Sequence, residues 1–139
     1  MKSYTDINQS KKLAEILPLE SADMHYNNAS IKGIDYVDEY KAELMDYNAA
    51  QKVLSKYLIN SMVEVIPCWS LASLLDVLKS KICYEKKFYY LNIEKDGTRW
   101  WIEYIERYGE ANPIETNSTE ELIDACYEMI LKLHEQKIL

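Results

Sequence analysis

The sequence has few of the residues that build common catalytic and cofactor sites. It contains only two histidines and three glycines, which lie at Gly33, Gly97 and Gly109. Three scattered glycines cannot form the glycine-rich loop that cradles phosphate groups. The histidines and cysteines show neither CxxC nor HxxxH spacing, the patterns that bring metal ligands together on one element. We therefore expect no metal and no cofactor.

Cysteine is scarce as well, and long apolar runs are missing. Cys68, Cys83 and Cys126 are an odd number of cysteines without paired spacing, which favours reduced thiols in a cytoplasmic protein. Each stands in an apolar neighbourhood, so we expect three buried, inert cysteines. No apolar run is long enough to cross a bilayer, and no secretory signal is visible. These features predict a cytoplasmic protein without membrane contact.

Basic residues are outnumbered, because 16 lysines and arginines accompany 23 aspartates and glutamates, a net charge of −7. An acidic protein repels the phosphate backbone, so we expect no nucleic-acid partner. The excess lies in the acidic segment Glu103–Glu128, where eight carboxylates accompany Arg107 alone. This segment either keeps the surface solvated or docks a basic protein. A third alternative is a DNA mimic, which needs its carboxylates in spaced rows.

The stretch 66–71, IPCWSL, predicts an extended segment that leads into a helix. Pro67 favours extended backbone in the residue before it. Ser70 is a good N-cap, and apolar residues at helical spacing follow it, which predicts a helix over 70–79. Beside a proline and a leucine-rich helix, Trp69 is interpreted as a core residue rather than a ligand-stacking one.

Three further helices are predicted from apolar residues at helical spacing, at about 6–16, 36–62 and 118–136. Ser118 and Glu121 have the spacing of a capping box at the start of the last helix. The middle helix, with Asp35 as a candidate cap, either covers the sheet or forms a dimer interface.

Residues 88–107 predict a β-hairpin. Asp96-Gly97 between two alternating runs is the signature of a two-residue type I′ turn. With that loop, Tyr90 would lie opposite Glu103 on the neighbouring strand. Twelve tyrosines and three tryptophans in the chain suit such half-buried sheet faces, and they suit interfaces equally well.

The polar face of this hairpin is the candidate functional region. It carries Tyr90, Trp101 and Glu103, which either form a ligand platform or pack under the middle helix. Glu120 and Asp124 of the acidic segment complete the candidate interaction face. Carboxylates near a helix start also stabilise the helix dipole, so neither needs a catalytic role.

Several short motifs follow one another in a fixed order along the chain. They are Ala22-Asp23-Met24-His25-Tyr26, the Ile66–Leu71 stretch, the hairpin, and Asp124-Ala125 followed by Glu128-Met129-Ile130. This order resembles a group of small uncharacterised proteins encoded by phages and mobile elements of Bacteroidales gut bacteria. The resemblance implies a bacterial or phage-infected cytoplasm and carries no assigned reaction. The segment 27–62 has no counterpart and is interpreted as a variable helical insertion.

Together these features predict a single α+β domain over residues 1–139. A small antiparallel sheet built on the hairpin would be packed by helices at about 6–16, 36–62, 70–79 and 118–136. We expect a non-catalytic interaction protein or accessory factor, with an unidentified protein partner or self-association. The alternatives are a ligand-binding protein or enzyme that uses Tyr90, Trp101 and Glu103, and an acidic DNA mimic.

Overall fold

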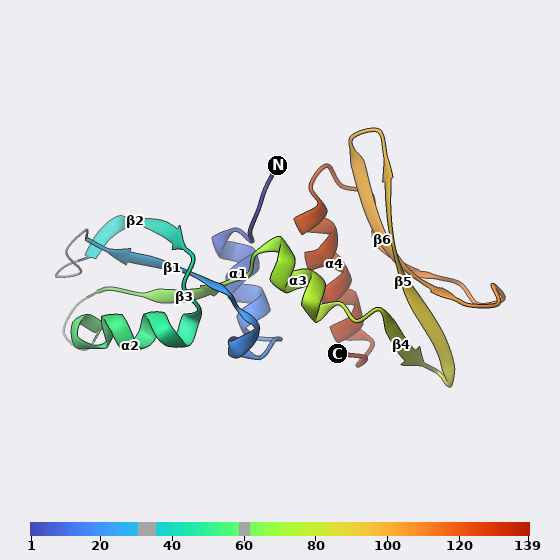
Figure 1. Ribbon diagram of the computed structural model, residues 1–139, viewed down its shortest axis with the longest axis horizontal. Helices are drawn as coiled ribbons and strands as arrows, with labels where there is room; N and C mark the ends of the chain where they lie inside the picture. The colour runs from blue at the N-terminus through green and yellow to red at the C-terminus, as the bar shows by residue number, and fades with distance from the viewer. Residues whose placement is uncertain (31–35, 59–61) are drawn as a thin grey trace. The chain divides into compact units, whose positions relative to one another are not determined.

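The computed structural model describes residues 1–30, 36–58 and 62–139 and shows an α+β protein (Figure 1). Within these residues four α-helices accompany two antiparallel sheets, one of three strands and one of four. The predicted fold class is therefore confirmed. No helix in the described part of the chain has the length and apolar character to cross a membrane.

The chain folds as two compact units. The first is Tyr4–Ser73, and the second combines Met1–Ser3 with Leu74–Leu139. The division falls within helix α3 (Leu71–Val77). That residues 1–139 act as a single domain stays a prediction.

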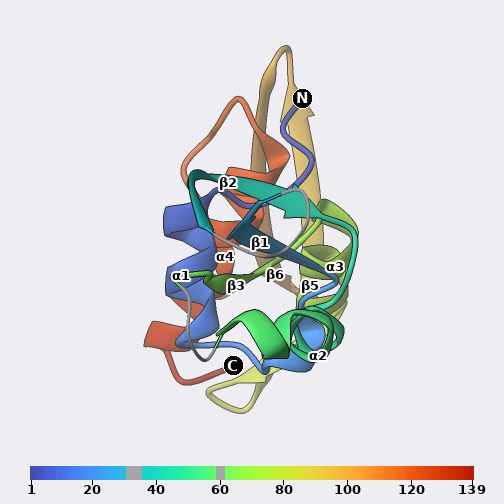
Figure 2. The same ribbon diagram turned by 90° about the vertical axis from the view of Figure 1, so that its left-hand side faces the viewer.

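The first unit is built on the sheet β2-β1-β3, with β1 antiparallel to both neighbours (Figure 2). Met24 and Tyr26 of β1 pack with Ile66 and Cys68 of β3 in its core. Apolar side chains on alternate positions of paired strands thus share one face. The elements of this unit are α1 (Ile7–Ala14), the short 3₁₀ helix η1 (Leu19–Ser21), β1 (Met24–Ala29), β2 (Tyr36–Glu43), α2 (Tyr47–Leu58) and β3 (Val65–Cys68).

The helix predicted over 36–62 is wrong in its first half, where the chain forms the edge strand β2. Val37, Tyr40 and Leu44 recur at helical spacing, which imitates an amphipathic helix. Pairing with β1 overrides that local pattern, and Leu44 is left 85% exposed. Helix α2 begins only after Asp46, whose carboxylate accepts a hydrogen bond from the Ala49 amide at 2.8 Å.

Other predictions for the segment 27–62 are met only in part. The segment 27–62 is not helical where β1 and β2 form, and that it is a variable insertion stays a prediction. Helix α2 packs within the first unit, against β3 and η1. The predicted cap Asp35 and residues 59–61 lie outside the described residues.

Two predicted helix starts are confirmed. At α1, the Asp6 carboxylate accepts from the Gln9 amide at 2.8 Å, and the Gln9 side chain accepts from the Asp6 amide at 3.1 Å. At α3, the Ser70 hydroxyl accepts from the Ser73 amide at 3.2 Å. Trp69 is fully buried, as expected of a core residue, and its indole N–H donates to the Ser21 hydroxyl at 2.9 Å.

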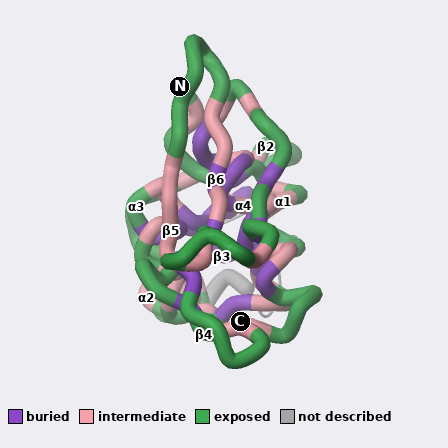
Figure 3. Tube along the Cα trace, turned by 90° about the vertical axis from the view of Figure 1, so that its right-hand side faces the viewer, coloured by how far each residue is buried: buried purple, intermediate pink, exposed green. Residues whose placement is uncertain are grey.

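The second unit is built on the sheet β4-β5-β6-β7. Figure 3 shows β5 and β6 partly buried along their middle and exposed at the turn that joins them. Helix α4 packs against β6, where Ile102 and Tyr104 are fully buried. The elements are β4 (Lys81–Tyr84), β5 (Lys87–Asp96), β6 (Arg99–Glu106), β7 (Ile114–Glu115) and α4 (Leu122–Glu135).

Two local predictions in this unit are wrong. Ser118 and Glu121 form no capping box, because the chain at Thr119 runs beside β6 and exchanges backbone hydrogen bonds with Trp100 at 2.6 and 2.8 Å. Helix α4 therefore starts at Leu122 rather than near 118. Cys83 lies on β4 and is exposed, whereas Cys68 and Cys126 are buried as expected.

Candidate functional site

The hairpin predicted over 88–107 is confirmed as β5 and β6, but its loop was placed one residue too early. Asp96 pairs with Arg99, so Gly97 and Thr98 form the loop. Gly97 has a φ of +59°, whereas Thr98 keeps a negative φ. That pattern belongs to a type II′ turn, which takes glycine first, while a type I′ turn needs positive φ at both residues.

The new loop changes the cross-strand partners without moving any side chain to the other face. Moving the loop by one residue gives each residue of β5 a partner two positions further along β6. Because side chains alternate between the two faces with a period of two, the new partner lies on the same face as the expected one. The face with Ile102 and Tyr104 therefore lies against α4, as the alternation predicted. The opposite face, which we call the open face, carries side chains that are half-buried or exposed.

On the open face, Tyr90 and Trp101 do not form a joint platform. Tyr90 lies opposite Ile105, and Trp101 lies beyond the next pair along the strands, Asn92 with Glu103. The Asn92 side-chain amide donates to a Glu103 carboxylate oxygen at 2.9 Å. The expected pairing of Tyr90 with Glu103 is therefore wrong. The three predicted residues share a face but do not converge on one point.

A denser group of side chains lies at the other end of the open face. We call it the cation–aromatic patch and define it as Lys81, Phe88, Tyr90, Ile105 and Arg107. Phe88 is 52% exposed and Ile105 is 37% exposed. The Lys81 ammonium lies 4.0 Å from the centre of the Phe88 ring and 5.8 Å from that of Tyr90. The Arg107 guanidinium carbon lies 5.5 Å from the Tyr90 ring centre.

Sequence reasoning missed this patch because it missed strand β4. The chain forms a strand at Lys81–Tyr84, outside the predicted hairpin, and this strand places Lys81 opposite Tyr90. Exposed cation–π contacts each contribute about 0.5–1 kcal/mol, so they hold both cations over the rings. The alternation of Phe88 with Tyr90 was the one local signal available.

No protein-family model, curated protein or solved structure matches the chain. The patch must therefore be understood from its own side chains. It differs in charge from the rest of the acidic molecule, because Lys81 and Arg107 are its only formal charges. A cation held over an aromatic ring keeps outward N–H groups that can donate to a carboxylate.

The two remaining candidate residues are engaged elsewhere. Glu120 lies 3.9 Å from the Arg99 guanidinium, beside the turn of the hairpin. Asp124, on α4, forms an ion pair with Lys2 at 3.0 Å. The predicted interaction face is therefore not one contiguous site.

Other carboxylates of the acidic segment Glu103–Glu128 are held by backbone amides. Glu106 accepts from Ala111 at 2.8 Å, Glu121 from Lys2 at 2.8 Å, and Glu128 from Asn117 at 3.1 Å. Carboxylates fixed to the protein's own backbone serve loop and helix structure. They do not form the free, spaced rows that a DNA mimic requires.

The two buried thiols, Cys68 and Cys126, are shifted away from the reactive thiolate form. Burial raises the pKa of Cys126 to about 12, and burial likewise raises the pKa of Cys68. Both thiols are therefore protonated near neutral pH. A protonated thiol is a poor nucleophile, because the thiolate is the reactive form. Among the described residues, no three His, Cys, Asp or Glu side chains come together to hold a metal ion.

Proposed function

We propose that the protein is a non-catalytic interaction factor that binds another protein through the cation–aromatic patch. The observation that carries this proposal is the exposure of Phe88 and Ile105 beside two cations on one open sheet face. Exposed apolar groups with a charged rim characterise interaction sites, and aromatic residues and arginine are enriched in them.

Charge complementarity defines the partner's chemistry. The patch is basic on a protein of net charge −7, so it favours a segment in which acidic residues alternate with apolar ones. An apolar side chain would cover Phe88, while carboxylates would accept hydrogen bonds from Lys81 and Arg107. A second copy of the chain is the competing occupant, because the acidic segment Glu103–Glu128 offers carboxylates of its own.

The setting of this interaction is part of the same proposal. The motif order from Ala22 to Ile130 resembles small proteins of Bacteroidales phages and mobile elements, which supports an accessory factor acting in the bacterial cytoplasm. In that setting the partner is a protein of the host or of the element itself.

Site-specific photo-cross-linking in a Bacteroidales host tests the proposal. A photoreactive benzoylphenylalanine replaces Phe88, and in a control chain it replaces Val53, which is 58% exposed on α2. We expect one discrete adduct from position 88 and none from position 53. Lys81→Glu combined with Arg107→Glu should remove the adduct, because both cations are then reversed.

The adduct also identifies the occupant. An adduct with twice the protein's own mass indicates a second copy of the chain, and mass spectrometry identifies any other partner. Equal labelling from both positions, or an adduct that survives the double charge reversal, would contradict binding through the patch.

A further inference from the structure

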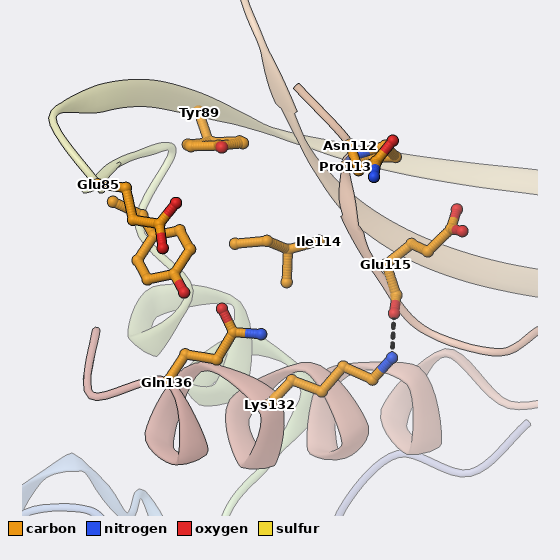
Figure 4. Close-up of a pocket in the computed structure, with 9 residues that line it drawn as sticks. Glu85, Tyr89, Asn112, Pro113, Ile114, Glu115, Lys132 and Gln136 are labelled. Carbon is orange, nitrogen blue, oxygen red and sulfur yellow. Dashed lines mark hydrogen bonds between the residues drawn. The ribbon is translucent and has the colours of Figure 1, made fainter. Parts of the chain in front are cut away.

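A polar cavity of about 330 Å³ lies in the second unit, on the side of the sheet that carries Tyr89 (Figure 4). Its walls come from the β4–β5 turn, the chain entering β7 and the last turns of α4. Small-molecule sites span roughly 300–1,000 Å³, so this cavity suits a ligand of about one ring. None of its residues belongs to the cation–aromatic patch.

The cavity has an apolar floor and a polar rim. Ile114 is buried and lies at the centre of the view in Figure 4, with Tyr89 on one side. The ring centre of Tyr84, another lining residue, is 6.4 Å from that of Tyr89. The polar residues of the rim are Glu85, Asn112, Glu115, Lys132 and Gln136. The Lys132 ammonium donates one hydrogen bond to the Glu115 carbonyl and keeps two further N–H donors.

The charges on the rim favour a ligand without net charge. Glu85 and Lys132 are of opposite sign and lie at opposite sides of the cavity in Figure 4. The carboxylate of Glu115, the second acid of the lining, points away from the cavity in the same view. An anion would be attracted by Lys132 but repelled by Glu85, and a cation the reverse. The ammonium and carboxylate of a free amino acid are attached to the same carbon, so they do not span the two sides.

The uncharged rim groups favour hydroxyls. The amides of Asn112 and Gln136 and the tyrosine hydroxyls each donate and accept hydrogen bonds, and a sugar hydroxyl does both as well. A pyranose also has an apolar face of C–H groups, which matches Ile114 and the Tyr84 ring.

We propose that this cavity binds a neutral pyranose sugar, with the apolar face of the ring against Tyr84 and Ile114 and the hydroxyls on the polar rim. The site is separate from the protein-binding patch.

Two-dimensional NMR of the isotope-labelled full chain tests this site. The probes are methyl β-glucopyranoside, methyl β-galactopyranoside, methyl α-mannopyranoside and N-acetylglucosamine, each added to millimolar excess. We expect at least one to shift the backbone amide signals of Glu85, Ile114 and Gln136 in a saturable way. The titration curve then provides the Kd.

Variants with a matched control decide whether the cavity is responsible. Gln136→Ala should raise the Kd by about three- to tenfold, the effect of one lost neutral hydrogen bond. Tyr84→Phe should weaken binding through its lost hydroxyl. Glu135→Ala, on the same helical turn but outside the cavity lining, should leave the Kd unchanged.

Three outcomes would overturn the proposal. One is that none of the four probes shifts the cavity signals. Another is that Gln136→Ala and Tyr84→Phe bind as tightly as Glu135→Ala. The last is that free serine, added as a zwitterionic comparison, shifts these signals while the sugars do not.

Discussion

The side-chain amide of Asn27 donates a hydrogen bond to Nε2 of the buried His25 at 3.0 Å. The amide oxygen of Asn27 accepts from the Ala29 backbone at 3.2 Å, so its NH₂ group must face the histidine. Nε2 is then the acceptor, and Nδ1 carries the proton that it donates to the Met45 carbonyl at 2.7 Å. These hydrogen bonds match the Nδ1–H tautomer of His25. Glu43, 3.6 Å from Nε2, would form an ion pair only with a protonated ring.

Asn27→Ala should lower the free energy of unfolding by about 1–3 kcal/mol, because it leaves the buried Nε2 without a donor. Urea unfolding of both proteins measures the difference. The control is Asn112→Ala, an exposed asparagine whose removal should change stability by less than about 0.5 kcal/mol. Equal stability of the Asn27 and Asn112 variants would show that the hydrogen bond to His25 contributes nothing.

Asp23 should stabilise the fold only while it is ionised. Burial, the largest single influence, raises its pKa, but hydrogen bonds from the hydroxyl and amide of Ser70 and from Ser73 together outweigh it and lower the pKa. A carboxyl with a depressed folded-state pKa contributes stability above its unfolded pKa and loses it as the pH falls.

The measurement compares wild type with Asp23→Asn by urea unfolding across acidic pH. The wild type should be more stable near neutral pH, and its advantage should shrink as the pH falls below about 4, the unfolded value for aspartate. A stability difference that does not change with pH would mean that the ionised form makes no special contribution.

Tyr104 should make stability fall at alkaline pH. Burial raises its pKa from 10.0 to about 12, and its hydroxyl donates to the Lys79 carbonyl at 2.6 Å. Between these values the unfolded chain loses the proton more readily than the folded one, so stability is full below pH 10 and declines as the pH rises.

The Tyr104→Phe variant has no hydroxyl to titrate. At neutral pH it should lower the free energy of unfolding by about 1–3 kcal/mol, because the Lys79 carbonyl loses its hydrogen-bond donor. Thermal unfolding at several alkaline pH values should therefore show that the difference in stability between wild type and variant becomes smaller as the pH rises. A constant gap would exclude Tyr104 as the cause of any alkaline loss of stability.

Asparagine and glycine in the β4–β5 turn should make the protein more stable than its own Glu85 and Lys86 do. Glu85 and Lys86 take φ values of +50° and +65°, which cost L-residues about 1–2 kcal/mol each. Glu85→Asn with Lys86→Gly supplies the residues that a turn with two positive φ values prefers, and should raise the free energy of unfolding by about 1–2 kcal/mol.

The chain contains its own control for this change, because Glu94 and Lys95 are the same residue pair inside β5. There both residues keep negative φ, so Glu94→Asn with Lys95→Gly should destabilise the hairpin. Urea unfolding compares the two double variants. Destabilisation by both would show that the turn is not strained.

Two helix starts and the hairpin were predictable from neighbouring residues in the sequence. The reciprocal bonds of Asp6 and Gln9, the cap at Ser70 and the existence of the 88–107 hairpin all follow from neighbouring residues. The division of the hairpin's side chains between two faces was also predictable. It depends only on alternation, which survived the error in the loop.

Pairing between distant residues was decided by the tertiary structure. Strand β2 forms because β1 offers it backbone partners, although its own residues suit a helix. The predicted box of Ser118 and Glu121 is lost because Thr119 bonds to Trp100 instead.

The candidate sites depend on such pairing as well. Lys81 contacts Tyr90 only because β4 pairs with β5. The cavity forms only because α4, Ile114 and the β4–β5 turn lie next to one another. Composition and periodicity determined the fold class and the buried face of the hairpin, because these require only which residues are apolar and how they alternate. The register, the edge strands and the positions of both proposed binding sites were decided by the tertiary structure, because the free energy of a contact depends on a partner that the local sequence does not specify.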